Sequence, residues 1–207
     1  MIKNLILDMG GVILDVNYET IFTSFEAKGV KGLDTFFTQQ KQLPLIDDFE
    51  VGKITPQEFR DGVRDLVKIN LSDKDIDEVW NSMVFDPRKE DILMLQQLKD
   101  KYDGLYLFSN TNEIHVEYVK DLFMKTMGFD IFSTIFTKVY FSNEIHERKP
   151  NVSSFDCVVK DAGINKEESL FIDDTIQNIE GAKLSGLHAL LLEKNKTLTD
   201  LMKEGVI

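Results

Sequence analysis

The sequence predicts an α/β fold in which a doubly wound parallel sheet is interrupted by an all-helical insert. Short apolar runs that end at Gly, Ser or Asp alternate with amphipathic stretches at the start of the chain and from about residue 87 onward. Strands separated by helices of this length require right-handed crossovers, which give a parallel sheet covered on both faces. Between about residues 17 and 86 the chain instead shows only helical periodicity. A chain of 207 residues is long enough for one full core and a smaller second one.

The first strand is expected at residues 2–7, an apolar run that continues into the loop DMGG at 8–11. A short apolar run that is stopped by glycines is typical of a buried strand followed by a tight loop. This strand therefore begins the sheet.

Four amphipathic stretches predict helices in the insert: FTSFEAKGV, TFFTQQKQL, TPQEFRDGVRDLVKI and SDKDIDEVWNSMVF. Two of them begin with helix caps, because the hydroxyls of Thr55 and Ser72 can accept hydrogen bonds from amides of the first turn. Pro56 and Glu58 strengthen the first of these starts, and Asp75 strengthens the second. Apolar residues fall on one face of the last two helices, so the insert can close a core of its own.

Alternating helices and strands are expected after the cap-and-proline pair Asp86-Pro87. In chain order they are a helix that ends near Gly104, the strand GLYLFS, a helix over 113–127, the extended segment STIFTKVYFS, a helix over 151–162, the strand SLFID, the helix TIQNIEGAKLSG and the strand HALLL. We therefore expect residues 1–16 and 87–207 to form the sheet domain and residues 17–86 to form the insert.

Composition limits the partners that this chain can have. Its formal charge of −12 provides no basic stripe for nucleic acid or for an anionic membrane surface. The apolar runs are too short to span a bilayer, and no signal-peptide pattern follows Met1. The single cysteine, Cys157, cannot form an internal disulfide, which suits a reducing, cytoplasmic location. We expect this cysteine on the buried side of a helix.

Four strand ends carry residues that can act together. Asp8 follows the first strand, Ser109 ends the second, Lys149 follows the third, and the pair Asp173-Asp174 ends the fourth. In such a sheet, ligands bind beyond the carboxyl ends of the strands. Three carboxylates at this edge would repel one another unless a lysine or a hard cation neutralised them, and a set of oxygen ligands suits Mg²⁺. Each residue alone is an ordinary cap or loop residue, but together they predict one site.

This set of residues predicts phosphoryl transfer from a small phosphorylated metabolite. An aspartate carboxylate such as Asp8 can attack phosphorus once the phosphoryl charge is screened, which gives an aspartyl-phosphate that water later hydrolyses. Mg²⁺ and Lys149 would screen that charge. The hydroxyl of Ser109 and the loop amides of residues 9–11 would hold the phosphoryl oxygens.

Four sequence motifs in order resemble those of the haloacid dehalogenase-like (HAD) superfamily: LILDMGGVILD, FSNTN, RKP at 148–150 and FIDDTIQNIEGAKLSG. The resemblance covers essentially the whole chain and is greatest to the branch that contains bacterial α-glucose-1-phosphate phosphatases. It implies a Rossmann-like core with a helical cap inserted directly after the first motif. The insert at 17–86 lies where such a cap would be.

The resemblance also implies roles for individual residues. Asp8 resembles the nucleophile and a metal ligand, and Gly10 would offer its backbone carbonyl to the Mg²⁺. Asp174 resembles the direct metal ligand of the last motif, with Asp173 supporting it, and Lys149 resembles the catalytic lysine that also binds phosphate.

Other residues are expected around the phosphate. Ser109 is implied as a phosphate ligand by position, and Asn110 and Gly11 are candidates for the same set. Asn112 and Asn178 are candidates for a supporting role only, since asparagine is also common where a helix starts.

One position departs from the pattern of the family. Most of its phosphatases have a second aspartate two residues after the nucleophile, which acts as general acid and base, and Gly10 can do neither. Loss of such a group typically costs about 10²–10⁴-fold in rate. A sugar phosphate such as a hexose 1-phosphate would need less protonation, because its anomeric oxygen leaves readily, and water or a cap residue could then substitute. Asp15 is nearby in sequence, but we expect it to be structural.

Two alternatives remain. The chain could be a HAD-fold ligand-binding protein with little or no turnover, which apolar side chains in the place left by Gly10 would favour. It could also be a metal-independent 2-haloacid dehalogenase, although the pair Asp173-Asp174 argues against this because such an enzyme holds no cation. His115, His146 and His188 have no ligand spacing with one another and are expected to be exposed or structural.

Overall fold

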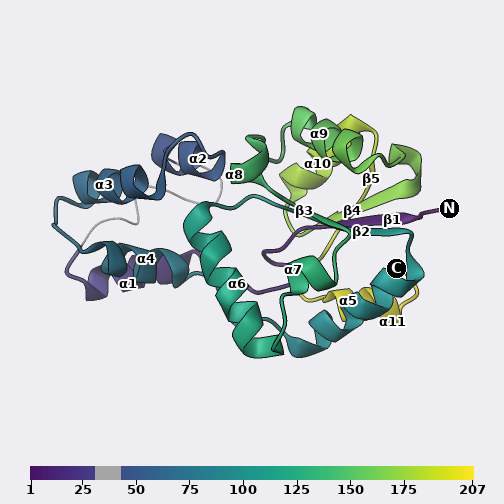
Figure 1. The fold of residues 1–207 in the computed structure, drawn as a ribbon, viewed down its shortest axis with the longest axis horizontal. Coiled ribbons are helices and arrows are strands. Elements are labelled where there is room, and N and C mark those ends of the chain that lie inside the picture. Colours follow the sequence, from purple (N-terminus) through teal and green to yellow (C-terminus); the bar gives the residue numbers. More distant parts are fainter. Residues whose placement is uncertain (31–42) are drawn as a thin grey trace.

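A five-stranded parallel sheet forms the centre of the protein. The computed structural model describes residues 1–30 and 43–207, and the strands lie in the order β3-β2-β1-β4-β5 with every neighbouring pair parallel (Figure 1). The strands are β1 (Asn4–Leu7), β2 (Gly104–Ser109), β3 (Lys138–Phe141), β4 (Ser169–Asp173) and β5 (His188–Leu191). The predicted doubly wound α/β fold is confirmed.

Helices cover both faces of this sheet. They are α5 (Lys89–Lys101), α6 (Glu113–Met127), α7 (Ile131–Thr134), α8 (Ser142–Ile145), α9 (Val152–Ala162), the 3-10 turn η2 (Lys166–Glu168), α10 (Ile176–Ser185) and α11 (Leu198–Lys203). One difference from the prediction concerns the segment STIFTKVYFS, whose first residues belong to α7. Asp130 starts this helix by accepting a hydrogen bond from the Phe132 amide at 2.9 Å, and this local cap outweighs the extended pattern.

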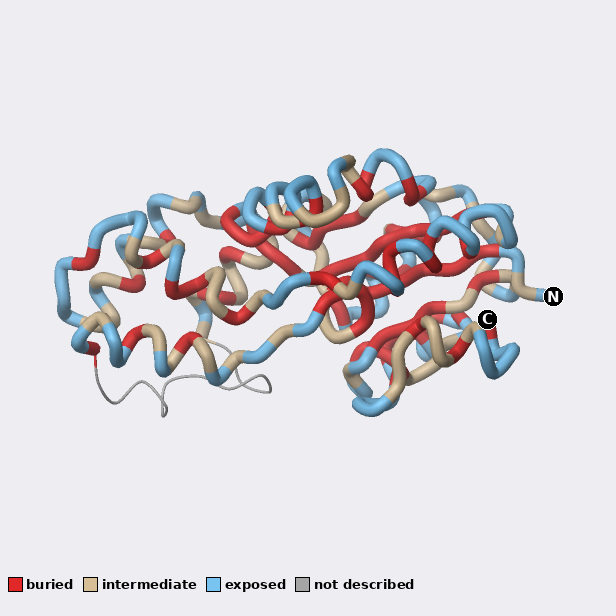
Figure 2. Tube along the Cα trace, turned by 90° about the horizontal axis from the view of Figure 1, so that it is seen from below, coloured by how far each residue is buried: buried red, intermediate tan, exposed pale blue. Residues whose placement is uncertain are grey.

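Alternate strand residues face opposite sides of the sheet, and a separate apolar core lies on each side. Leu5 and Leu7 of β1 belong to the core that α5, α6 and α11 cover, whereas Ile6 belongs to the core under α9 and α10. Burial on both faces explains why the strands are almost continuous apolar runs. Figure 2 shows the sheet buried along its length and the exposed residues on the outer sides of the helices.

Helices α1 to α4, which we call the helical group, pack around a third core beside the sheet (Figure 1). They are α1 (Glu19–Ala27), α2 (Pro44–Glu50), α3 (Pro56–Val67) and α4 (Asp73–Asn81). Both predicted caps are present, because Thr55 and Ser72 accept hydrogen bonds from the third amide of α3 and α4 respectively. The helix expected over TFFTQQKQL lies outside the described residues except for Leu43.

Cys157 on α9 is half-buried rather than buried, because the neighbouring Val158 and Val159 occupy the core side of the helix. Within the described ranges, each helix is too short or too polar to cross a membrane.

Close packing of α10 against the end of the β3–α9 connection determines where the Lys149 loop lies. A Cβ atom built on Gly181 would overlap the carbonyl oxygen of Pro150, which directly follows Lys149. Only glycine allows this approach of helix to backbone.

We predict that Gly181→Ala destabilises the protein by about 1–3 kcal/mol, because the Pro150 carbonyl cannot move without displacing the Lys149 loop. Gly62 on α3 is the matched control, since a Cβ there meets only the flexible end of Leu45. Gly62→Ala should be neutral or stabilising, as alanine favours a helix by about 0.5–1 kcal/mol over glycine. Urea unfolding of both variants measures the difference, and equal free energies of unfolding would contradict the prediction.

Candidate active site

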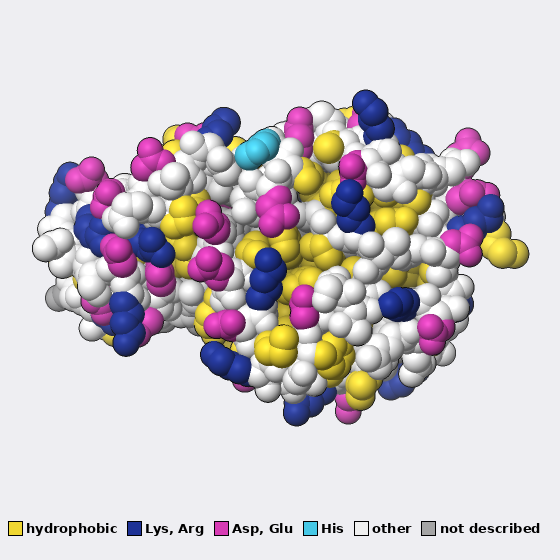
Figure 3. Space-filling model, viewed as in Figure 1, with side chains coloured by type: hydrophobic (Ala, Val, Ile, Leu, Met, Phe, Trp, Pro, Cys, Tyr) yellow, Lys and Arg dark blue, Asp and Glu magenta, His cyan; other side chains and the backbone are white. Residues whose placement is uncertain are grey.

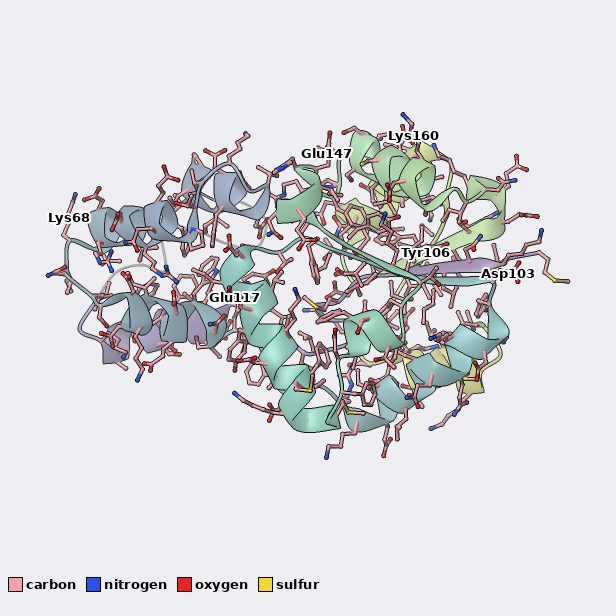
Figure 4. The ribbon with its side chains drawn as sticks, viewed as in Figure 1. Lys68, Asp103, Tyr106, Glu117, Glu147 and Lys160 are labelled. Atoms are coloured by element: carbon pink, nitrogen blue, oxygen red, sulfur yellow. The ribbon has the colours of Figure 1, made fainter. Side chains whose placement is uncertain are left out.

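The carboxyl ends of the three central strands bring the predicted residues together. β1 lies between β2 and β4, so Asp8 stands between Ser109 at the end of β2 and Asp173 at the end of β4. Lys149 reaches the same edge from the loop that follows α8. Glu147, labelled in Figure 4, marks this loop beside α8. The four strand ends thus meet at one site.

A buried ion pair network forms the centre of the site. The Lys149 ammonium lies 2.8 Å from Asp8 Oδ1 and 2.7 Å from Asp173 Oδ2, and the lysine side chain is 1% exposed. The rings of Phe108 and Phe171 lie 5.3 and 5.2 Å from the same nitrogen. The two carboxylates and the two rings together compensate the positive charge that burial removes from water.

Both carboxylate oxygens of Asp173 accept hydrogen bonds. Its carboxylate accepts hydrogen bonds from the Thr175 amide at 2.8 Å and from Asn178 Nδ2 at 2.9 and 3.1 Å, in addition to its contact with Lys149. Asn178 is therefore adjacent to the site and contacts it through Asp173. With its oxygens used in this way, Asp173 is suited to positioning Lys149.

Asp8, Asp173 and Asp174 form a cluster that could hold a hard cation. One oxygen of each carboxylate lies within 4.8 Å of the other two, and Asp174 is the exposed member. Burial raises the pKa of Asp8 to about 7; the nearby Lys149 ammonium opposes this shift, while the charges of Asp173 and Asp174 add to it. Desolvation and the charge of Asp173 also raise the pKa of Asp174. A divalent cation would relieve this repulsion, so the donor set fits Mg²⁺.

Two predicted phosphate-binding residues make other contacts. The Gly11 amide donates to the Leu14 carbonyl at 2.7 Å, and the glycine backbone lies against the Asp174 carboxylate. Asn110 Nδ2 donates to the Lys149 carbonyl at 2.9 Å, and Asn110 Oδ1 accepts from the Lys149 amide at 3.0 Å. Asn110 thus holds the lysine backbone instead of facing a phosphate. The expected donation from Gly11 to phosphate does not match this loop, because turn formation uses its amide.

Ser109 keeps the position that was predicted. Its side chain is buried, and its hydroxyl makes one long contact of 3.4 Å with the Asn110 carbonyl oxygen. A hydroxyl held this loosely is able to turn toward an oxygen of a ligand.

The family description "haloacid dehalogenase-like hydrolase" matches residues 2–186 of this chain. The chain belongs to this family. The predicted HAD family is therefore confirmed, and the protein is a HAD-like hydrolase.

Three relatives are similar over most of their length. A D-ribitol-5-phosphate phosphatase of Bacteroides thetaiotaomicron is 30% identical over 188 residues, which cover 90% of this chain and 89% of the relative. A HAD family enzyme of B. thetaiotaomicron, solved in complex with magnesium and inorganic phosphate, has a TM-score of 0.89 and 34% identity over 97% of this chain and 99% of that one. A HAD-like family hydrolase structure from Porphyromonas gingivalis has a TM-score of 0.86 and 28% identity over 100% of this chain and 98% of that chain.

The helical group of this HAD-like hydrolase contacts the start of α6 through Trp80 of α4. Asn112 Oδ1 accepts hydrogen bonds from the His115 amide at 3.1 Å and from Trp80 Nε1 at 3.3 Å, and His115 Nε2 bonds to the Trp80 carbonyl at 3.0 Å. The Trp80 and His115 rings stack with centroids 5.2 Å apart. Burial lowers the pKa of His115 to about 4, so this histidine is neutral and structural. Glu117, labelled in Figure 4, marks this part of α6 beside α4.

A second contact joins α2 to the loop that carries Lys149. Arg148 pairs with Asp47 and with Glu50, the latter at 2.9 Å. The Ser142 hydroxyl donates to the Glu50 carbonyl at 2.6 Å, and His146 Nδ1 bonds to the Val51 carbonyl at 2.9 Å. Figure 3 shows acidic side chains along the boundary between the helical group and the sheet. No sequence pattern predicted these contacts, although the position of Arg148 beside Lys149 in the RKP motif was a signal.

The space that a side chain at position 10 would occupy is partly filled by the apolar side chain of Val16. A Cβ atom at position 10 would lie 3.1 Å from Val16 Cγ2. Asp15 is exposed and pairs with Arg88 at 2.6 Å, which agrees with the expected structural role. Gly10 itself has no side chain that could donate a proton.

We predict that Asp8→Asn gains stability relative to the wild type as pH rises from 5 to 8 in EDTA. The pKa of Asp8 is raised above that of an unfolded chain, so its contribution to stability is complete below about pH 4 and is lost as pH rises through about 7. The asparagine variant lacks this loss, and the difference in the free energy of unfolding should change by more than about 1 kcal/mol. Urea unfolding at both pH values measures it.

Asp121→Asn on the exposed side of α6 is the matched control. Its free energy of unfolding should change with pH as that of the wild type does. The same behaviour in Asp8→Asn would contradict the environment described for Asp8.

Proposed function

We propose that this HAD-like hydrolase is a Mg²⁺-dependent phosphatase that hydrolyses a small phosphoester of a sugar or sugar alcohol through an aspartyl-phosphate on Asp8. The observation that carries the proposal is the cluster of Asp8, Asp173 and Asp174 within 4.8 Å, with the Lys149 ammonium buried between two of its members. Asp8, Asp174 and the carbonyl of Gly10 would hold Mg²⁺, which supplies positive charge against the phosphoryl oxygens.

Each site residue would have its own role in the reaction. Asp8 forms a bond to phosphorus while the bond from phosphorus to the leaving oxygen breaks, and water then cleaves the aspartyl-phosphate. Lys149 neutralises charge on the nucleophile and on the phosphoryl group, with Asp173 and Asn110 positioning it. Ser109 and the amides of Met9 and Gly10 bind the phosphoryl oxygens.

The relatives support a phosphatase, and two classes of substrate are candidates. One relative is named for a sugar-alcohol 5-phosphate, and the motifs of this chain resemble phosphatases of a hexose 1-phosphate. These differ chemically, because a primary alkoxide leaves less readily than an anomeric oxygen. In both cases residues 17–86 would act as a cap that closes over the substrate and excludes water.

The alternative of a ligand-binding protein with little turnover has one observation in its favour, the apolar Val16 beside Gly10. The carboxylate cluster that could hold a cation argues against a metal-independent dehalogenase. Activity measurements distinguish all three.

Purified protein with Mg²⁺ should release phosphate from ribitol 5-phosphate, glucose 1-phosphate or p-nitrophenyl phosphate. We expect Asp8→Asn to lower kcat/KM by more than about 10³-fold, since the variant has no nucleophile, and EDTA to abolish the activity. Phosphate release is the measurement. No release above Asp8→Asn on any phosphoester would end the phosphatase proposal, and dehalogenation of a 2-haloacid that survives EDTA would establish the alternative reaction.

A further inference from the structure

The position of the Lys149 ammonium in the site depends on the backbone that carries it. The ammonium pairs with Asp8 and Asp173, and the lysine side chain is 1% exposed, so it has little room to move. Asn110 bonds to the amide and to the carbonyl of Lys149, at 3.0 and 2.9 Å, and thus holds this residue from the end of β2. The preceding residue, Arg148, is held by the helical group.

Two carboxylates of α2 pair with the Arg148 guanidinium. One terminal nitrogen contacts Asp47, and the other lies 2.9 Å from Glu50 Oε2. The side chains of Arg148 and Glu50 are 23% and 12% exposed, so water and salt screen this pair less than a surface ion pair. Because consecutive Cα atoms are about 3.8 Å apart, a displacement of the Arg148 backbone also displaces Lys149.

The segment between α8 and Lys149 also packs against the end of α2. A Cβ atom built on Gly52 would overlap the Asn143 carbonyl oxygen, so the backbone after α2 lies directly against α8, and Figure 1 shows the two helices side by side. His146 has a φ of 57°, in the left-handed region that residues with a side chain rarely adopt. Its Nδ1 bonds to the Val51 carbonyl at 2.9 Å, and this contact supports the conformation. The path of the chain toward Lys149 therefore depends on α2.

The ion pairs of Arg148 also limit the roles that its side chain can have. An arginine next to a phosphate site could bind the substrate, but the terminal nitrogens of Arg148 are already paired with Asp47 and Glu50. Contact with an anionic substrate would break these pairs and remove the positive charge that the mostly buried Glu50 carboxylate now faces. A role in placing the loop needs no such rearrangement.

We propose that Arg148 is a positioning residue that sets the place of Lys149 by holding this loop against the carboxylates of α2. This role depends on the proposed function, in which Lys149 neutralises charge on Asp8 and on the phosphoryl group. Both carboxylates, Asp47 and Glu50, belong to the helical group. The helical group therefore contributes to the rate of phosphoryl transfer through the Lys149 loop.

Arg148→Gln tests this role on two phosphoesters that differ in their alcohol. They are p-nitrophenyl phosphate and whichever of ribitol 5-phosphate and glucose 1-phosphate is hydrolysed faster. We expect kcat to fall by about 10-fold or more, and by a similar factor for both esters, because both present the same phosphoryl group to Lys149. A rise in KM for the sugar or sugar-alcohol ester alone, with kcat unchanged, would show that Arg148 binds the substrate and would overturn the proposal.

Two further changes separate positioning from a loss of stability. Arg148→Lys keeps a charge that can pair with an α2 carboxylate, so its kcat should fall less than about 3-fold. Asp47→Asn combined with Glu50→Gln removes the same pairs from the other side, and kcat should fall about as far as in Arg148→Gln. Adding Arg148→Gln to this double variant should lower kcat less than about 2-fold further. Losses that multiply in full would contradict a shared role.

Arg60→Gln is the matched control. Arg60 is 19% exposed and pairs with Asp77 at 2.8 Å, which joins α3 to α4 within the helical group, so this variant should keep the wild-type kcat on both esters. An equal fall in Arg60→Gln, or a wild-type kcat in Arg148→Gln, overturns the role of Arg148 while the phosphatase stands. A wild type as inactive as Asp8→Asn removes the proposed function as well. All assays are made at a temperature at which circular dichroism shows every variant folded.

Discussion

The ammonium group of Lys149 lies between two carboxylates in a position almost fully removed from water. Burying any one of these charges without its partners would cost about 3–5 kcal/mol, so the three groups are mutually dependent. The rest of the site maintains this arrangement. Asn110 bonds to the lysine backbone, Asn178 bonds to Asp173, and Gly181 lets α10 approach the loop behind Lys149. The excess negative charge left on Asp8 and Asp174 is what makes the site suited to a cation and a phosphoryl group.

The helical group is connected to this charge network at two places of different character. The contact of Trp80 with Asn112 and His115 is buried, aromatic and neutral, and it begins three residues after Ser109. The contact of α2 with Arg148 is ionic and lies next to Lys149. Each contact therefore adjoins, along the chain, a residue proposed to bind phosphate: Ser109 in the first case and Lys149 in the second.

The sequence was sufficient to predict which strand ends meet, because parallel strands place their carboxyl ends at one edge of the sheet. It therefore identified Asp8, Ser109, Lys149, Asp173 and Asp174 as neighbours. The sequence did not show that the Gly11 amide closes its own turn, because hydrogen bonding inside a loop depends on its backbone path. Glu50 was missed for a related reason: helical periodicity shows which residues of α2 pack in a core, but not that Glu50 at the end of this helix pairs with Arg148. The one-turn helix α7 depends on a cap that a short apolar pattern conceals.

A crystal structure with Mg²⁺ and beryllium fluoride, a mimic of an aspartate-bound phosphoryl group, tests whether Asp8, Asp174 and Lys149 form one site for a cation and a phosphoryl group. We expect the beryllium to be bonded to the Asp8 carboxylate, the Mg²⁺ to contact Asp8 and Asp174, and Lys149 to lie within hydrogen-bonding distance of a fluorine. An ion and a phosphoryl mimic bound elsewhere, with Lys149 still enclosed by Asp8 and Asp173 alone, would contradict it.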